Sequence, residues 1–289
     1  MFTTYILFAL CYILALLPLC VLYVFGWIFS IVLNYVIRYR RKVIEGNLQK
    51  AFPEKSAKEL RKLRNQYYWH LSQIAVEMIK MLVLPRCILH RRYYCANPEL
   101  VNQFYEIGRS VILLSSHYNN WEWMILALDD MFLHHGVGIG KANSDKVFER
   151  LINRARTRYG TEVVFADTVR ETFEHYETAR TPAAYMMLSD QNPNSKSRCY
   201  VTNFMNQKTG VIFGAEHFAR KYNIPVLYYN VVKERLGKYR IEVQIITEKP
   251  NEMPEYSITQ RYVELLESDI RKQPAFWLWS HRRWKFKFE

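Results

Sequence analysis

The stretch VILLSSHYNNWEW, from Val111 to Trp123, decides the fold and supplies the first functional hypothesis. Val111 to Leu114 is a short apolar run typical of a buried strand, and Trp121 to Leu128 has the apolar spacing of a helix. Together they predict that His117 lies on a strand-to-helix turn. They also predict that Glu122 lies in the first turn of the helix that follows.

This pair, His117 and Glu122, suggests acyl transfer. A histidine on such a turn can accept a proton from a hydroxyl or an amine, and a nearby carboxylate can fix its tautomer and stabilise the imidazolium. The spacing alone is weak evidence, since a chain with eight histidines gives about one such match by accident. The alternative is a histidine at a strand end, with Glu122 as an ordinary helix N-terminal charge.

Short apolar strands alternate with helices after about residue 93. This alternation predicts an α/β fold with a mixed, largely parallel sheet flanked by helices, in which ligands bind at the carboxyl ends of strands. The last two strands suggest an antiparallel hairpin at one edge of the sheet. The predicted strands are Ser110 to Ser115, Gly136 to Gly140, Glu162 to Phe165, Ala183 to Leu188, Pro225 to Val232 and Tyr239 to Ile246.

A second polar group follows the predicted strand Ala183 to Leu188. Asp190 and Gln191 emerge at its carboxyl end and are candidate substrate-binding residues. An aspartate followed by Asn192 and Pro193 is also common in an ordinary turn.

Basic residues form a third group in the predicted helix Lys146 to Tyr159. Arg154, Arg156 and Arg158 alternate there, so they point to different faces and at most one or two can reach a cleft. An arginine in that position could stabilise an oxyanion or bind a substrate phosphate. Arg154 and Arg156 are therefore candidate substrate-binding residues.

Two amphipathic segments each allow two interpretations. Apolar residues recur at helical spacing from about Ala57 to Leu84, which favours a helix packed on the core over one lying on a bilayer. The segment from Pro274 to Glu289 interleaves aromatic and basic residues. That pattern fits either a membrane interface or the ordinary packing of a final strand.

The N-terminal segment is predicted to be a membrane anchor. Met1 to Ile37 contains no Lys, Arg, Asp, Glu or His and exceeds the roughly 20 residues needed to span a bilayer. Pro18 and Gly26 could divide it into spanning and interfacial parts. Arg38 to Lys42 place the remaining chain in the cytoplasm. The expected organisation is an anchor (1–37), a membrane-proximal helical segment (38–90) and an α/β acyltransferase domain (91–289).

The net charge of +13 lies entirely after the anchor. Beside a membrane, this charge favours anionic lipids, phosphorylated substrates or an acidic carrier protein over nucleic acid. The five cysteines show no C-x-x-C spacing, which indicates a reducing compartment and neither disulfides nor a zinc site. No cofactor is expected. A basic nuclease is another functional class to consider, but it would need a metal site that the histidine spacing does not provide.

In the order of its motifs, the chain resembles the lauroyl and myristoyl acyltransferases of lipid A biosynthesis, a branch of the lysophospholipid acyltransferase superfamily. The resemblance covers nearly the whole chain. It rests on the uncleaved anchor, the basic passage from Arg41 to Pro53 with Asn47 and Phe52, and the block His117, Asn120, Trp121 and Glu122. It also rests on Arg154, Arg156 and Gly160, on Asp190 and Gln191, on Phe213 to Ala215, and on the tail from Trp277 to Lys285.

The resemblance implies that His117 is the general base with Glu122 as its partner. It implies that Asn120, an arginine near Arg156 and Asp190 place substrate groups. The implied donor is a fatty acyl chain on acyl carrier protein. The implied acceptor is a hydroxyl of a lipid A precursor in the bacterial inner membrane, with the catalytic domain in the cytoplasm. The chain departs from the family at Asn119 and Asn194, where glycine is usual, and this leaves the identity of the acceptor open.

Three further hypotheses stay open. The glycerolipid branch of the superfamily pairs His with Asp and carries an E-G-T-R block, which this chain lacks, so a glycerolipid acceptor is the weaker interpretation. An amine acceptor, as in amino-acid lipids, would use the same base. A protein of another class, a non-catalytic membrane scaffold, would transfer no acyl chain at all.

Overall fold

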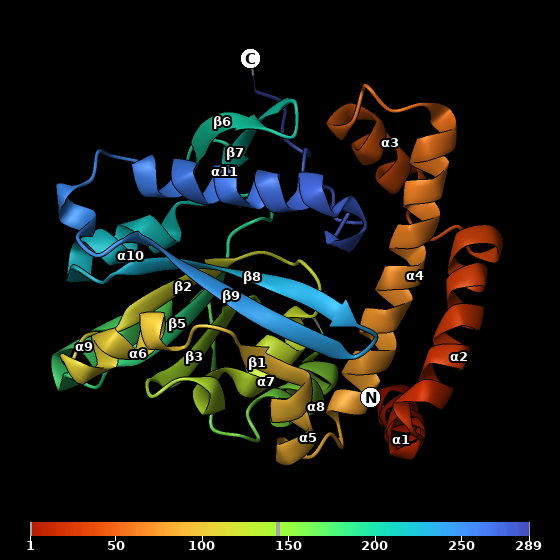
Figure 1. The fold of residues 1–289 in the computed structure, drawn as a ribbon, viewed down its shortest axis with the longest axis horizontal. Coiled ribbons are helices and arrows are strands. Elements are labelled where there is room, and N and C mark those ends of the chain that lie inside the picture. Colours follow the sequence, from red (N-terminus) through yellow and green to blue (C-terminus); the bar gives the residue numbers. More distant parts are fainter. Residues whose placement is uncertain (1, 143–144, 289) are drawn as a thin grey trace.

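The computed structural model describes residues 2–142 and 145–288 and shows a seven-stranded sheet between layers of helices (Figure 1). The strand order is β1-β9-β8-β2-β5-β3-β4, and all neighbouring pairs are parallel except β8 and β9. The strands are β1 (Tyr93–Cys95), β2 (Val111–Ser115), β3 (His135–Gly140), β4 (Glu162–Phe165), β5 (Ala183–Leu188), β8 (Val226–Arg235) and β9 (Lys238–Thr247). A separate hairpin is formed by β6 (Tyr200–Phe204) and β7 (Gln207–Val211).

Strand β2 lies at the centre of the sheet and is buried on both faces. Ile112 and Leu114 pack into one core cluster, while Val111 and Leu113 pack into the other, as the alternation of side chains along a strand requires. One cluster includes side chains of α9 (Val169–Ala179), α10 (Gly214–Tyr222) and α11 (Ser257–Lys272). The other includes side chains of α5 (Arg86–Arg92), α6 (Glu99–Glu106), α7 (Trp121–Met131) and α8 (Lys146–Arg156).

The predicted α/β class is confirmed, and so are the six predicted strands. The antiparallel pairing of the last two is confirmed as well, but the expectation that they form an edge of the sheet is wrong. The short strand β1 pairs with β9 in parallel and covers that edge. Three residues are too few for a period-two pattern to identify a strand.

The long amphipathic segment forms α4 (Ala57–Met81) and packs on the core, as its mixed charges favour. The helix begins at a capping box in which Ser56 and Glu59 exchange hydrogen bonds. Two rings of the aromatic C-terminal segment are also packed inside the protein. Trp277 is 2% exposed and Trp279 is fully buried, so the core-packing interpretation holds for these rings, although residues 274–288 form a 3-10 helix (Pro274–Phe276) and turns in place of a strand.

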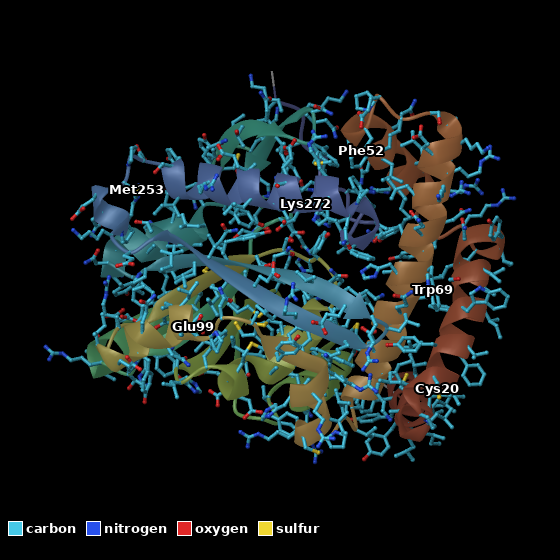
Figure 2. All side chains as sticks on the ribbon, in the orientation of Figure 1. Cys20, Phe52, Trp69, Glu99, Met253 and Lys272 are labelled. Atoms are coloured by element: carbon cyan, nitrogen blue, oxygen red, sulfur yellow. The ribbon has the colours of Figure 1, made fainter. Side chains whose placement is uncertain are left out.

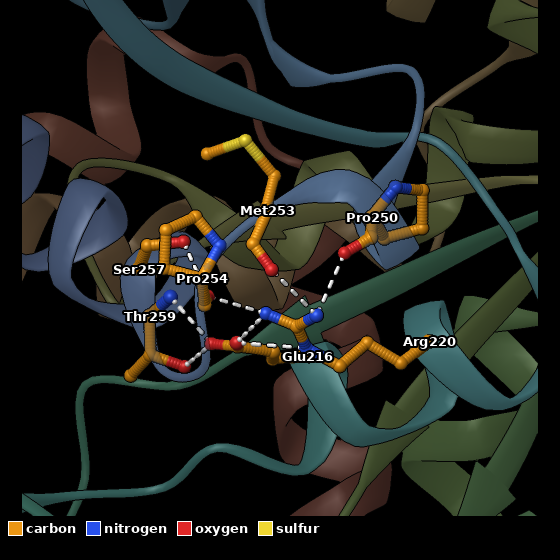
Figure 3. A network of polar contacts seen from close by, with 7 residues as sticks. All are labelled: Glu216, Arg220, Pro250, Met253, Pro254, Ser257 and Thr259. Carbon is orange, nitrogen blue, oxygen red and sulfur yellow. Dashed lines mark hydrogen bonds and ion pairs between the residues drawn. The ribbon is translucent and has the colours of Figure 1, made fainter.

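Helix α11 is held against α10 by hydrogen bonds to Glu216, whose carboxylate also forms an ion pair with Arg220 within α10 (Figure 3). Glu216 accepts hydrogen bonds from the backbone nitrogen and the hydroxyl of Thr259, at 2.9 and 2.6 Å, which satisfies the first turn of α11. Arg220 binds Glu216 and donates to the carbonyls of Pro250, Met253 and Pro254. This network fixes α11, whose Tyr262 hydroxyl then donates to the Ser115 carbonyl at the end of β2.

Two apolar helices precede the basic segment and lie outside the sheet layers. Helix α1 (Phe2–Leu16) and helix α2 (Leu19–Ile31) are separated at Pro18, and α2 continues as a π-helical turn (Val32–Val36). Figure 2 labels Cys20 on α2 and Trp69 on α4, two helices that run side by side. The stretch Leu19–Val36 is long and apolar enough to cross a membrane. A short helix α3 (Arg41–Ala51) follows it.

Candidate active site

The candidate site is formed where β2 and β5 end side by side. The two strands are parallel, with Ser115 paired to Leu188, and the Ser189 nitrogen donates to the Ser115 carbonyl. Two residues further along, His117 and Asp190 therefore face each other. The distance between His117 Nδ1 and Asp190 Oδ1 is 2.7 Å.

The Asp190 carboxylate is fixed on its other side by the C-terminal segment. Trp277 Nε1 donates to Asp190 Oδ2 at 2.9 Å, and Trp277 forms an isolated β-bridge with Tyr118. The Asp190 side chain is 3% exposed, whereas the His117 side chain is 19% exposed. The carboxylate is thus enclosed, while the imidazole reaches the surface.

This contact fixes the protonation pattern of the imidazole. Because Asp190 lies at Nδ1, that nitrogen carries the proton and donates it to the carboxylate. Burial lowers the pKa of His117, but the charge and hydrogen bond of Asp190, with the charge of Glu122, outweigh it and the pKa is raised. Burial raises the pKa of Asp190, and the charge and hydrogen bond of His117 outweigh it, so the carboxyl pKa is lowered.

The second ring nitrogen of His117 is left to accept a proton. Gln191 Nε2 lies 3.2 Å from His117 Nε2 and can donate to it. The ring of Trp121 meets the imidazole edge-on at a centroid distance of 5.2 Å. These two residues border the place where a hydroxyl would have to approach Nε2.

Glu122 is held by Arg156 in a two-point ion pair. Arg156 Nε lies 2.8 Å from Glu122 Oε2, and Arg156 Nη2 lies 2.6 Å from Glu122 Oε1. The Glu122 and Arg156 side chains are 5% and 17% exposed, respectively. Trp121 Nε1 donates to Glu122 Oε1 at 3.2 Å. Such fork-shaped pairing fixes both side chains.

The carboxylate that binds His117 is therefore not the one that the sequence spacing indicates. Glu122 is predicted to hold the ring, whereas the structure places Asp190 at Nδ1 and pairs Glu122 with Arg156. The reason is geometric. The register of β2 and β5 brings Asp190 to Nδ1 of His117, while Glu122 lies in the first turn of α7 and pairs with Arg156 of α8.

Asn120 is completely buried and supports the start of α7. Its Oδ1 accepts from the Trp123 nitrogen at 2.9 Å as the helix N-cap, and its Nδ2 donates to Glu77 Oε2 at 2.6 Å. Both ends of the amide are therefore engaged within the protein, with α7 and α4, and the Asn120 carbonyl accepts from the Tyr93 hydroxyl of β1 at 3.0 Å.

The other two candidate arginines, Arg154 in α8 and Arg158 just after its end, lie outside the site. The Arg154 side chain is exposed, on a different face of α8 from Arg156. Arg158 donates to the carbonyls of Met81, Leu82 and Leu84, where it supports the end of α4. Of the three, Arg156 is the one that the fold brings to Glu122 and His117, as the expectation of one or two inward-facing arginines allows.

Two supporting residues were not predicted from the sequence. Trp277 holds the Asp190 carboxylate in place through its hydrogen bond, whereas its position in an aromatic segment of the sequence indicates only that the ring is buried. Asn119 has a left-handed backbone (φ 53°), and its Nδ2 donates to the Val231 carbonyl at 2.6 Å. Asparagine tolerates this conformation better than most residues, which explains how the turn forms without a glycine.

Among residues 2–142 and 145–288, no cluster of three or more His, Cys, Asp or Glu is arranged to hold a metal ion. The site itself presents an imidazole, a carboxylate that orders it and an adjacent ion pair.

The family model of bacterial lipid A biosynthesis acyltransferases matches residues 1–286. The chain belongs to this family. A search of curated proteins returned no match. Membership in the acyltransferase family assigns acyl transfer to the chain as its class of reaction and lipid A biosynthesis as the setting.

Proposed function

We propose that this acyltransferase moves a fatty acyl chain from acyl carrier protein to a hydroxyl of a lipid A precursor, with His117 as general base. The observation that carries the proposal is the contact between Asp190 and His117 Nδ1. It leaves Nε2 as the acceptor on a ring that is 19% exposed.

In the proposed reaction, His117 Nε2 takes the proton of the acceptor hydroxyl as its oxygen attacks the thioester carbonyl. The tetrahedral intermediate collapses, the carbon–sulfur bond breaks, and the imidazolium returns its proton to the thiolate. An ester and a free thiol result. Asp190 stabilises the imidazolium through its hydrogen bond, as the carboxylate of a catalytic triad does.

The ion pair has a different proposed role. The charge of Glu122 favours the imidazolium, as its contribution to the raised His117 pKa indicates, and Arg156 holds Glu122 in place. We retain Gln191 as a group that contacts the incoming hydroxyl. Arg154, exposed on α8, is proposed to meet the acidic surface of the carrier. A direct substrate contact for Asn120 stays a sequence prediction, since its amide is engaged elsewhere.

The apolar N-terminal helices are proposed to attach the enzyme to the bacterial inner membrane, with residues 38–90 proximal to the membrane and residues 91–289 forming the cytoplasmic domain. The support is a row of exposed apolar side chains on α1 and α2. These include Leu7, Leu10, Ile13, Leu16, Val24, Phe25, Trp27 and Ile28. The basic residues that follow favour the cytoplasmic side.

The test is a transfer assay with the full chain in detergent or vesicles, acyl carrier protein thioesters as donors, and mass spectrometry of the product. We expect an added acyl chain on a lipid A precursor. Transfer to a glycerolipid or an amino-acid lipid instead would refute the proposed acceptor. No transfer to any acceptor by well-folded protein would favour the scaffold hypothesis and refute the proposal.

A further inference from the structure

Glu77 is a fully buried carboxylate in α4, and it is separate from the proposed catalytic pair of His117 and Asp190. Its Oε1 accepts from the Tyr23 hydroxyl at 2.6 Å. Its Oε2 accepts from Asn120 Nδ2 at 2.6 Å and from the Tyr239 hydroxyl at 2.7 Å. A buried carboxylate is costly unless donors surround it, and this one receives donors from three separate elements. Glu77 therefore joins α2, the turn before α7, and β9 at a single point.

One end of this junction fixes the catalytic turn, which we define as residues 116–120 between β2 and α7. Asn120 cannot reverse its amide, because its Oδ1 already accepts from the Trp123 nitrogen as the N-cap of α7. Its Nδ2 must therefore donate, and Glu77 provides the acceptor. Asn120 stands between His117 and Glu122 in the chain, so a shift of Asn120 moves the start of the helix that carries Glu122.

The other end reaches the apolar N-terminal helix. Helix α2 and its π-helical continuation run antiparallel to α4. Tyr23 of α2 donates to Glu77, and Asn34 Nδ2 of the continuation donates to Asn65 Oδ1 at 2.9 Å. Between these contacts Gly26 lets the helices approach closely. A Cβ atom there would lie 3.2 Å from a methyl group of Val76.

We propose that Glu77 is a positioning residue through which the seating of α2 on α4 holds the catalytic turn in place. Tyr23, Glu77 and Asn120 form a continuous hydrogen-bonded bridge from the proposed membrane helix to the N-terminus of α7. Helix α2 is then part of the support of the active site in addition to being an anchor. The inference rests on the proposed function, which supplies the activity to be measured.

Two substitutions distinguish the loss of this hydrogen-bonded bridge from a general weakening of the packing of α2 on α4. Tyr23→Phe removes a hydrogen bond from α2 to α4, and Asn34→Ala removes one from the π-helical turn after α2 to α4. Of these two contacts, only that of Tyr23 is made to Glu77. We expect Tyr23→Phe to lower kcat about fivefold with an unchanged KM for the acyl donor, since misplacement of a catalytic turn slows chemistry more than binding. Asn34→Ala should keep the wild-type kcat.

Substitutions of Glu77 itself test whether its acceptor atoms matter. In Glu77→Gln the amide oxygen can accept from Asn120 and Tyr239, while its nitrogen donates to the Tyr23 hydroxyl, so the bridge can persist. We expect kcat within about twofold of wild type. Glu77→Met fills a similar volume without acceptors and should lower kcat about tenfold or more.

Amide hydrogen exchange provides a readout that does not depend on turnover. Exchange at residues 120–124 should rise in Tyr23→Phe and Glu77→Met and stay at the wild-type rate in Asn34→Ala and Glu77→Gln. Equal effects of Tyr23→Phe and Asn34→Ala, or wild-type kcat and exchange in Glu77→Met, would overturn the bridge. If wild-type protein transfers no acyl chain, the proposed function fails, while the exchange comparison still decides the bridge.

Discussion

The two carboxylates beside His117 have opposite relations to it. Asp190 is 73 residues away in the chain, yet it binds the ring directly at Nδ1. Glu122 is five residues away in the sequence, yet it binds Arg156 and acts on the ring through its charge alone. The comparison teaches that in a parallel sheet the strand register decides which acid meets a strand-end histidine, and spacing along the chain does not.

The two acids also differ in the groups that surround them, because Asp190 contacts the imidazole and Glu122 is paired with an arginine. Asp190 binds His117 and Trp277 directly, and its charge also acts on the buried Arg283 and on His281. Glu122 is neutralised by Arg156, whose own charge lowers the pKa of His117 and opposes the effect of Glu122. Removing Asp190 should therefore disturb the base far more than removing Glu122.

The largest effect should come from the base that both acids serve. His117→Ala should lower kcat about 1000-fold, because the reaction then lacks its proposed general base. The measurement is the rate of acyl transfer, with circular dichroism and thermal melting to show that the variant is folded. Wild-type turnover in this variant would show that His117 is not the base. The comparison of Asp190 with Glu122 as partners of His117 would then say nothing about catalysis.

Asp190→Asn should have the next largest effect, about a 100-fold decrease in kcat, because the imidazolium loses its counter-charge and the tautomer its fixed acceptor. The pH profile gives the sign. A base must be unprotonated, so activity rises with pH through the raised pKa of His117. Without Asp190, burial dominates, and this acid limb should move to lower pH. A limb that stays in place or moves to higher pH would contradict the assigned contact.

Glu122→Gln should lower kcat about tenfold and move the acid limb less than Asp190→Asn does. Its larger effect is on stability, because Arg156 is left without its partner. We expect a loss of about 3 kcal/mol in chemical denaturation. The double variant Glu122→Gln/Arg156→Gln should recover part of that loss, and Arg154→Gln, on the exposed face of α8, should stay within about 0.5 kcal/mol of wild type.

Equal limb shifts in Glu122→Gln and Asp190→Asn would show that both acids act on the ring alike, and the distinction between them would fail.

The smallest expected effect is the pH dependence of stability. The raised pKa of His117 stabilises the fold below the ordinary histidine value of about 6.5, and this contribution is lost as the pH rises through the raised pKa. The lowered pKa of Asp190 stabilises the fold above its ordinary value of about 3.9 and is lost as the pH falls through the lowered pKa.

Wild type should therefore exceed Asp190→Asn in stability by about 2 kcal/mol near pH 5 to 6, with a smaller difference at pH 9. Thermal melts of both proteins across this range would measure it. A difference that grows with pH would mean that the pair is not charged in the folded protein.

Much of the fold follows from local patterns. The apolar runs of β2 and β5 identify these strands, and the polar residues that follow them identify both His117 and Asp190 as strand-end groups. What the patterns lack is the order of the strands. Strands β3 and β4 lie between β2 and β5 in the sequence. The adjacency of β2 and β5 in the sheet therefore depends on long-range pairing, which a short stretch of sequence does not reveal.

The supporting residues show the same limit. Trp277 could be recognised as an aromatic in a basic tail, but its bond to Asp190 joins positions 87 residues apart. Glu77 falls within an amphipathic helix, where a charged residue is normally expected to be exposed. Its three donors come from α2, β9 and the turn before α7, and they become visible only when those elements are assembled.

The most direct test is the pKa of His117 measured by NMR of ring-labelled histidine in wild type, Asp190→Asn and Glu122→Gln. The spectra should show a raised pKa in wild type, a large fall in Asp190→Asn, and a small fall in Glu122→Gln, with the Nδ1 proton signal lost or shifted only when Asp190 is replaced. A larger fall in Glu122→Gln than in Asp190→Asn would contradict the account and return Glu122 to the place of direct partner.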